Sequence, residues 1–258
     1  MTALCEAVLA ALSGWHERPL ILGICGAQGS GKSTLASELT RHMNAAVLSL
    51  DDLYLAPERR PVEVHPLFAT RGAPGTHDVA LGARVLDALR SGARVRLPRF
   101  DKAADAPLPE DQWPEAEAPD IIIFEGWCVG AAPQPAADLT EPVNDLERMH
   151  DPDGVWRRHV YAQLAGPYRD LFARIDRLVF LQAPDFEVVH AWRCQQEHEL
   201  RRKMIAEARP DTTMSDEKIA IFIQHYERLT RHLLRTLPDR ADVVLRLDAG
   251  RRLIGQSR

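Results

Sequence analysis

Near the start of the sequence lies the segment Gly26-Ala27-Gln28-Gly29-Ser30-Gly31-Lys32-Ser33-Thr34, whose first eight residues match the pattern G-x-x-x-x-G-K-[S/T] at every position. The apolar run Leu20–Cys25 before them predicts a buried strand, and residues 33–43 predict a helix. In that context the glycines let the backbone close around phosphates, and the helix start attracts the same anion. Lys32 would contact the β- and γ-phosphate oxygens, and the Ser33 hydroxyl would ligate Mg²⁺. These residues predict a nucleotide site but no particular reaction.

Composition narrows the class of protein. The chain has 258 residues, of which 45% are hydrophobic and 27% charged, as in one large globular α/β domain. A net charge of −5 favours neither nucleic acid nor an anionic membrane as a partner, and the apolar runs are too short to span a bilayer. No secretion signal is apparent, and the four scattered cysteines suggest reduced thiols. We therefore expect a cytoplasmic protein.

Strand and helix patterns alternate along the chain. Apolar runs predict strands at 20–25, 46–50, 121–124, 178–181 and 243–247, the last closing the chain, and helices are predicted at 3–14, 33–43, 78–90, 154–173, 185–206 and 215–236. Long loops rich in proline follow two of the strands, near 56–78 and 98–119. This order predicts a single domain over residues 1–258. Its fold would be α/β and doubly wound, the P-loop NTP hydrolase fold, with a mostly parallel sheet and helices on both faces. The ligand site of such a fold lies at the carboxyl ends of the strands.

An acidic pair, Asp51-Asp52, follows the second apolar run. Just past a strand beside the phosphate loop, Asp51 would point toward the γ-phosphate. There it could accept the proton of an attacking hydroxyl or help hold the metal. The pair could instead only cap the loop. If the strand continued, Asp52 would point to the opposite side.

A third acidic residue, Glu125, directly follows the apolar run Ile121–Phe124. A carboxylate at that position can polarise a water bound to Mg²⁺. Glu125 could alternatively be a surface residue at a strand end, but a charge next to buried apolar residues needs a partner. Ser33 and Glu125 are therefore the candidate metal ligands.

Positive charge for phosphoryl transfer is commonly delivered by a mobile helical lid. The helix predicted near 185–210 could form such a lid, with Arg193 as the candidate among Arg193, Arg201, Arg202 and Lys203, although arginine-rich helices are often solvated faces. Polar residues on the two long loops could hold a small anionic or hydroxylated acceptor. The candidate acceptor-binding residues are Asp51, Tyr54, Arg71, His77, Asp78, Arg99, Asp101 and Lys102.

Taken together, these segments resemble the D-glycerate 3-kinase family, which is related to uridine kinase, phosphoribulokinase and bacterial pantothenate kinase. The matching segments keep the family order over most of residues 20–250: Gly26–Thr34, Ser49–Tyr54, Arg71–Asp78, Pro98–Lys102, Phe124–Trp127 with Gly130, Asn144–Glu147, Ala191–Arg193 with Gln196–Glu197, and Met214–Glu217. The resemblance implies that Asp51 is the general base, that Glu125 helps organise Mg²⁺, and that Arg193 is a lid arginine.

We therefore expect an ATP-dependent kinase of a small hydroxylated acid, with D-glycerate favoured as the acceptor and with Lys32, Asp51, Glu125 and Arg193 as catalytic residues. One alternative is the same fold acting on a nucleoside, pantothenate or a sugar phosphate. Another is a nucleotide-dependent switch or ATPase that phosphorylates nothing. The acidic residue at position 51 favours a kinase over a switch.

Overall fold

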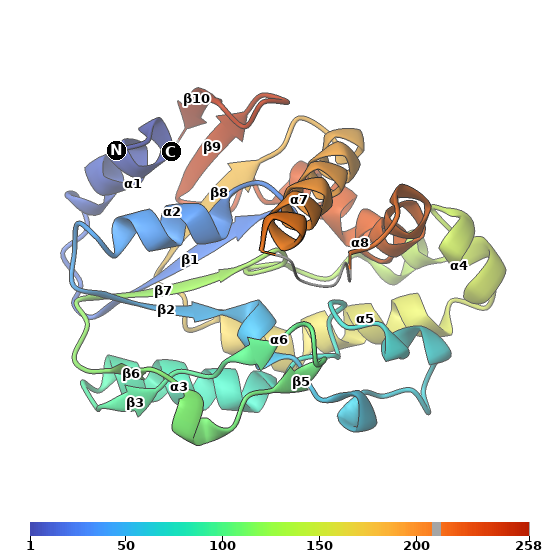
Figure 1. Ribbon diagram of the computed structural model, residues 1–258, viewed down its shortest axis with the longest axis horizontal. Helices are drawn as coiled ribbons and strands as arrows, with labels where there is room; N and C mark the ends of the chain where they lie inside the picture. Colours follow the sequence, from blue (N-terminus) through green and yellow to red (C-terminus); the bar gives the residue numbers. More distant parts are fainter. Residues whose placement is uncertain (208–212, 258) are drawn as a thin grey trace.

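A six-stranded sheet forms the centre of the computed structural model, which describes residues 1–207 and 213–257 (Figure 1). The strands lie in the order β10-β9-β8-β1-β7-β2, and all are parallel except β10, which runs antiparallel to β9. The bounds of these strands are β1 (Leu20–Gly26), β2 (Ala45–Ser49), β7 (Ile121–Gly126), β8 (Arg177–Gln182), β9 (Val243–Leu247) and β10 (Leu253–Ser257). The mostly parallel sheet predicted from the sequence is confirmed.

Helices cover both faces of the sheet. Every residue of β1 and of β7 is buried, as expected for parallel strands covered on two sides. Helices α1 (Ala3–Leu12) and α2 (Lys32–Leu39) lie on one face, and α3 (Val79–Arg90) and α6 (Pro167–Phe172) lie on the other (Figure 1). The chain therefore has the doubly wound α/β architecture that was predicted.

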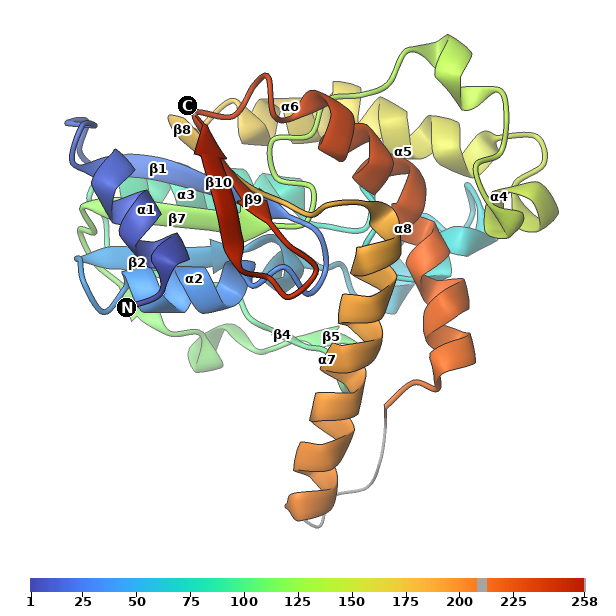
Figure 2. The same ribbon diagram turned by 90° about the horizontal axis from the view of Figure 1, so that it is seen from above.

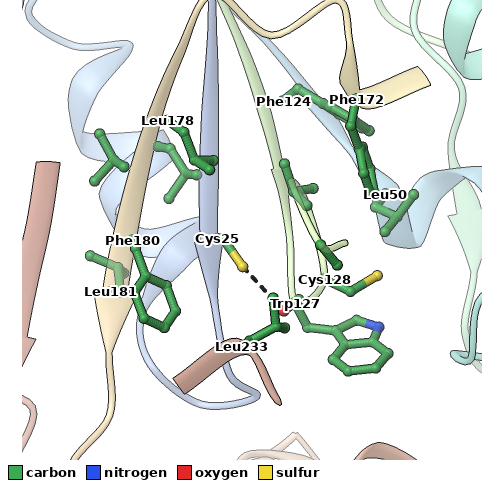
Figure 3. Close-up of a cluster of buried hydrophobic side chains, with 14 of the residues drawn as sticks. Cys25, Leu50, Phe124, Trp127, Cys128, Phe172, Leu178, Phe180, Leu181 and Leu233 are labelled. Carbon is green, nitrogen blue, oxygen red and sulfur yellow. Dashed lines mark hydrogen bonds between the residues drawn. The ribbon is translucent and has the colours of Figure 1, made fainter. Parts of the chain in front are cut away.

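Large apolar side chains fill the space between the sheet and its helices (Figure 3). Phe124 of β7 packs against Phe172 of α6, with ring centroids 6.3 Å apart. The Cys25 thiol donates to the carbonyl of Trp127 at 3.4 Å, and burial raises the pKa of Cys25 to about 12. All four cysteines are free thiols, as predicted, and Cys25 is a packing residue.

Several elements differ from the sequence-based expectation. The helix expected at 154–173 is divided into α5 (Val155–Ala165) and α6, because Pro167 cannot continue the hydrogen bonding of α5 and begins a new helix instead. A further helix, α4 (Asp145–His150), precedes them. The segment 98–119 contains short strands rather than only a loop. Within it, β4 (Phe100–Asp101) pairs with β5 (Ala106–Pro107), and β6 (Glu115–Ala116) pairs with β3 (Val95–Arg96), which lies just before the segment.

The expectation that 243–247 is the last strand is wrong, because β10 follows it at the edge of the sheet. Residues of β10 alternate between half-buried and exposed, so the strand lacks the continuous apolar run that marks the interior strands. The segment is a strand because it pairs with β9, and this pairing cannot be read from a short sequence of mixed polarity.

Two long helices follow β8. They are α7 (Phe186–Ala206), which projects away from the sheet (Figure 2), and α8 (Asp216–Thr236), which is capped by the Ser215 hydroxyl. The predicted lid near 185–210 coincides with α7, but its residues 208–210 and the side chain of Lys203 lie outside the described part of the chain. Among the described residues, no helix combines the length and apolar character needed to cross a bilayer.

A buried ion pair joins α4 to α8. The Glu147 carboxylate has no exposed surface and accepts two hydrogen bonds from Arg228, at 2.8 and 2.6 Å. Removing one partner of such a pair leaves the other charge buried and uncompensated, which typically costs about 3–5 kcal/mol.

We predict that Glu147→Gln lowers the free energy of unfolding by about 3 kcal/mol or more, because the Arg228 guanidinium loses its countercharge inside the protein. Urea unfolding of the two proteins measures the change. Glu187→Gln is the matched control, since Glu187 pairs with Arg231 at a surface where its side chain is 67% exposed. The control should cost less than about 1 kcal/mol. Equal destabilisation by the two variants would contradict a special role of the buried pair.

Candidate active site

The predicted phosphate-binding loop joins β1 to the start of α2. Gly31 precedes that helix with a φ of 94°, which residues with a side chain rarely adopt, and provides no side-chain cap. The amide of Gln28 and the hydroxyl of Ser30 are buried without a hydrogen-bond partner among the described residues. Because buried polar groups are normally paired, and because helix starts attract anions, a phosphate group fits this loop.

Lys32 and Ser33 are the first two residues of α2, and their side chains bind different partners. The Lys32 ammonium donates to the carbonyl of Ala27 at 3.1 Å, and the Ser33 hydroxyl donates to Glu125 Oε1 at 3.0 Å. Glu125 is only 4% exposed and lies in β7 opposite Ile24 of β1. The structure therefore brings together the two residues predicted to hold Mg²⁺, and both offer the oxygen atoms that this ion prefers.

Asp51 lies in a turn of 3₁₀ helix, Leu50–Leu53, that begins directly after β2. Ser49 caps this turn by accepting a hydrogen bond from the backbone N–H of Asp51. The Asp51 carboxylate is held on both oxygens, by the Lys102 ammonium at 2.6 Å and by the Tyr54 hydroxyl at 2.8 Å. Three predicted site residues from two different loops thus meet at one carboxylate.

Lys102 keeps Asp51 ionised. Burial raises the pKa of the Asp51 carboxyl, but the nearby Lys102 ammonium, the Tyr54 hydroxyl and the charge of Lys32 together lower it to about 2. The charge of Lys32, in the phosphate loop, therefore acts on the Asp51 carboxyl. At neutral pH Asp51 is a carboxylate of low basicity for as long as Lys102 remains in contact.

Asp52 occupies a separate position. It accepts a hydrogen bond from the backbone N–H of Phe100 at 3.2 Å and pairs with Arg99 at 3.4 Å. The strand does not continue past Ser49, so strand alternation does not place Asp51 and Asp52 on opposite sides. Their different partners, rather than alternation, distinguish the two carboxylates.

Arg71 places a second cation against Tyr54, the residue that donates to Asp51. Its guanidinium carbon lies 5.9 Å from the centre of the Tyr54 ring and 5.7 Å from that of Phe100. Asp105 accepts from Arg71 at 2.5 Å and also forms a two-point ion pair with Arg60, which is 2% exposed. Two guanidinium groups share one carboxylate, so this corner of the site keeps an excess of positive charge.

The backbone of the loop that carries Arg71 is fixed by α8 and by the end of β7. A Cβ atom on Gly72 would lie 2.0 Å from the Tyr226 hydroxyl, so only glycine allows this approach. Tyr226 donates to the carbonyl of Arg71 at 3.1 Å, and the Trp127 indole donates to the carbonyl of Gly72 at 3.0 Å. These contacts explain why a glycine follows Arg71.

Two of the predicted acceptor-binding residues, Asp78 and Asp101, form hydrogen bonds to backbone groups close to them in the sequence. Asp78 caps α3 by accepting from the backbone N–H of Leu81 at 2.9 Å, and it pairs with the exposed Arg59. Asp101 accepts from two backbone N–H groups of its own turn. Their roles in acceptor binding stay predictions. His77 is buried beside Tyr54, and its ring stacks on the Tyr54 ring.

Arg193 does not join the cluster around Asp51. Its guanidinium pairs with Glu197 at 2.5 Å and lies 5.9 Å from the centre of the Phe222 ring, so its contacts are on α7 and α8. The lid role of Arg193 stays a prediction.

The neighbouring residue, Trp192, does connect α7 to the phosphate loop. Its indole donates to the carbonyl of Ala249 at 2.8 Å, and the guanidinium carbon of Arg251 lies 5.3 Å from its ring centre. Arg251, from the turn between β9 and β10, donates to the carbonyl of Gly29 at 2.6 Å. Nothing local in the sequence marks Arg251 as a partner of a loop more than two hundred residues earlier.

A glycine-rich loop, a Ser–Glu pair that could hold Mg²⁺ and an ionised carboxylate after a strand of the same sheet are the features expected of a P-loop kinase. The chain is 40% identical over 230 residues to the kinase mug58 of Schizosaccharomyces pombe, across 81% of this chain and 79% of that kinase. It is 31% identical over 239 residues to the chloroplastic D-glycerate 3-kinase of Arabidopsis thaliana, across 85% of this chain. This chain spans about half of the plant enzyme, 48% of its length.

A solved structure agrees with these relatives. D-glycerate 3-kinase from Cryptococcus neoformans var. grubii superposes with a TM-score of 0.78 at 26% identity, across 98% of this chain and 96% of that one. No protein-family model matches the chain. The chain belongs to the family of P-loop kinases that contains mug58 and the D-glycerate 3-kinases.

Proposed function

We propose that this protein transfers the γ-phosphoryl group of ATP to a small hydroxylated acid, with D-glycerate as the favoured acceptor and 3-phosphoglycerate as the product. The observation that carries the proposal is the cluster at Asp51, where a carboxylate that can take a proton lies with the cations Lys102 and Arg71. A molecule with one hydroxyl for Asp51 and one carboxylate for the cations matches this cluster. The names of the Arabidopsis and Cryptococcus relatives support the same acceptor.

In the transfer step, the acceptor oxygen forms a bond to the γ-phosphorus. The bond to the bridging oxygen breaks, and its electron pair leaves with ADP. Asp51 accepts the proton of the attacking hydroxyl, while Lys32 and the amides of residues 26–34 hold the phosphate oxygens. Ser33 and Glu125 would hold Mg²⁺, which when bound neutralises charge on the phosphates.

Lys102 links acceptor binding to the basicity of Asp51. In the free protein its ammonium lies 2.6 Å from the Asp51 carboxylate and lowers the pKa of that group. An acceptor carboxylate would share this ammonium and weaken its contact with Asp51. Because burial alone raises the pKa of Asp51, the carboxylate would become a stronger base when the acceptor is bound.

Helix α7 is proposed to act as the lid. It projects from the sheet (Figure 2), and Trp192 near its start contacts Arg251, which donates to Gly29 of the phosphate loop. Arg193 is proposed to leave its ion pair with Glu197 and to place its charge over the transferring group.

The proposed partner is a small molecule, and the proposed compartment is the cytoplasm. The four cysteines are free thiols, the state that reducing conditions maintain. The formal net charge of −5 gives no electrostatic reason for binding a nucleic acid.

An acceptor panel tests the proposal. The purified protein is supplied with ATP and Mg²⁺, and ADP release is measured with D-glycerate, a nucleoside, pantothenate and a sugar phosphate. We expect acceptor-dependent ADP release with D-glycerate, together with 3-phosphoglycerate formation. Faster turnover of another acceptor would show that this molecule is the substrate instead. ATP hydrolysis independent of any acceptor would point to a switch or ATPase.

A further inference from the structure

His77 is an imidazole enclosed by two tyrosines. It is 4% exposed, and the Tyr54 ring stacks on it with ring centroids 4.7 Å apart and planes inclined by 29°. The Tyr168 ring meets it edge-on, with centroids 5.7 Å apart and planes at 80°. The two loops that carry Tyr54 and His77 are also joined by an antiparallel bridge between these residues. The ring of His77 is therefore held in one orientation.

The Tyr168 hydroxyl determines which nitrogen of His77 carries the proton. Tyr168 is fully buried, and its oxygen accepts a hydrogen bond from the backbone N–H of Gly75 at 3.0 Å. The same oxygen lies 2.6 Å from His77 Nδ1. A hydroxyl has one proton to donate, and a buried donor left unpaired is costly, so the hydroxyl donates to Nδ1. Because Nδ1 is the acceptor, the ring proton lies on Nε2.

The Nε2–H group has no partner among the described residues. Nε2 of His77 is buried and makes no hydrogen bond to that part of the chain. Burial lowers the pKa of His77 to about 3, although the charge of Asp51 opposes this, so the ring is neutral at neutral pH. Unpaired buried donors are rare in native proteins and require an explanation.

The unpaired donor is linked to the region proposed for the acceptor through Tyr54. Tyr54, which stacks on His77, also donates to Asp51 Oδ1 at 2.8 Å, and the charge of Asp51 acts on the imidazole. Asp51 is assigned to the reacting hydroxyl, and Lys102 and Arg71 supply cations for the carboxylate. A neutral donor suits the remaining uncharged oxygen of a dihydroxy acid.

We propose that His77 Nε2–H donates a hydrogen bond to the hydroxyl of the acceptor that does not react, and that Tyr168 is the positioning residue that keeps the proton on Nε2. This inference rests on the proposed function. His77 would then select an acid that carries this second hydroxyl over an acid that lacks it. Charge plays no part in that discrimination, because both molecules have the same carboxylate.

Two substrates and two variants test the proposal. 3-Hydroxypropanoate has the carboxylate and the reacting hydroxyl of D-glycerate but lacks its second hydroxyl. His77→Asn places its amide near the Nδ1 position, whereas His77→Gln can reach the Nε2 position. We expect His77→Asn to lower kcat/KM for D-glycerate by about tenfold and to change kcat/KM for 3-hydroxypropanoate much less, with His77→Gln retaining most of the preference. An equal loss for both substrates would overturn the proposal.

Nuclear magnetic resonance of the wild-type protein gives an answer even if the variants do not fold. The ¹⁵N signals of His77 should show a proton on Nε2 and an unprotonated Nδ1, and Tyr168→Phe should remove this bias. Saturating D-glycerate should shift the Nε2–H signal, whereas 3-hydroxypropanoate should not. A proton on Nδ1, or no shift with bound D-glycerate, would overturn the proposal. A wild-type protein that does not phosphorylate D-glycerate would instead contradict the proposed function, while the tautomer would still be measurable.

Discussion

Asp51→Asn should lower kcat with D-glycerate by about 10²–10⁴-fold, the range that a general base typically contributes. Asparagine keeps the shape of the side chain, but its single oxygen can replace only one of the two carboxylate oxygens that accept from Tyr54 and Lys102, and it cannot take the proton of the acceptor hydroxyl. The affinity for ATP should change much less, because the nucleotide phosphates are assigned to residues 26–34. Steady-state ADP formation and ATP binding, measured on the same preparations, separate the two effects.

Asp52→Asn is the comparison for this prediction. Asp52 is one residue further on and accepts from the backbone of Phe100, a bond that asparagine can retain. We expect a smaller loss of kcat. If Asp52→Asn were the more damaging change, the base would be Asp52. If neither change slowed turnover, the base would lie elsewhere, with Asp78 and Asp101 as the next candidates despite their local bonds.

The low pKa of Asp51 also has a consequence for pH dependence. Burial raises this pKa, but Lys102, the Tyr54 hydroxyl and the charge of Lys32 together bring the value to about 2, so the carboxylate is lost only as the pH falls toward that value. The acid limb of kcat/KM reports groups of the free enzyme. Protonation of Asp51 should therefore not limit kcat/KM anywhere between pH 4 and neutrality (about two units or more above its pKa).

Lys32→Ala should lower kcat/KM by about 10³-fold or more, since a cation over the transferring phosphoryl group contributes on that scale. The fold should persist, because the hydrogen bond of the Lys32 ammonium is to the carbonyl of Ala27 within its own loop. Turnover and the midpoint of thermal unfolding measure the two expectations.

Lys218→Ala is the matched control for the loss of a lysine. Lys218 is exposed in the first turn of α8, so its removal should leave turnover near the wild-type value. If Lys32→Ala were as active as Lys218→Ala, the assignment of residues 26–34 to the nucleotide phosphates would be wrong.

The phosphate loop and the carboxylates at the strand ends could be predicted from the sequence because each depends on local order. A glycine-rich segment between an apolar run and a helix pattern can form little else, and Asp51 and Glu125 each directly follow or end such a run. Parallel strands bring their carboxyl ends to one edge of the sheet, so these residues were expected to lie together. Pro167 was a local signal that the helix of residues 154–173 would divide, but the helical pattern continued past it and concealed the break.

The partners of these groups depend on which loops meet, and the sequence does not encode that locally. Asp105 becomes the shared countercharge of Arg60 and Arg71 only when three loop segments come together, and Arg251 reaches Gly29 only because β10 folds back along β9.

By itself, then, the sequence determined the fold class, the phosphate loop and the carboxylates at the ends of its strands, since side-chain periodicity and turn chemistry act over a few residues. The tertiary structure alone decided that Lys102 holds Asp51 and that Tyr168 orients His77. Hydrogen bonds and ion pairs form between whichever groups packing brings within about 3 Å, and residues fifty or more positions apart reach that distance only once the sheet and its helices have assembled.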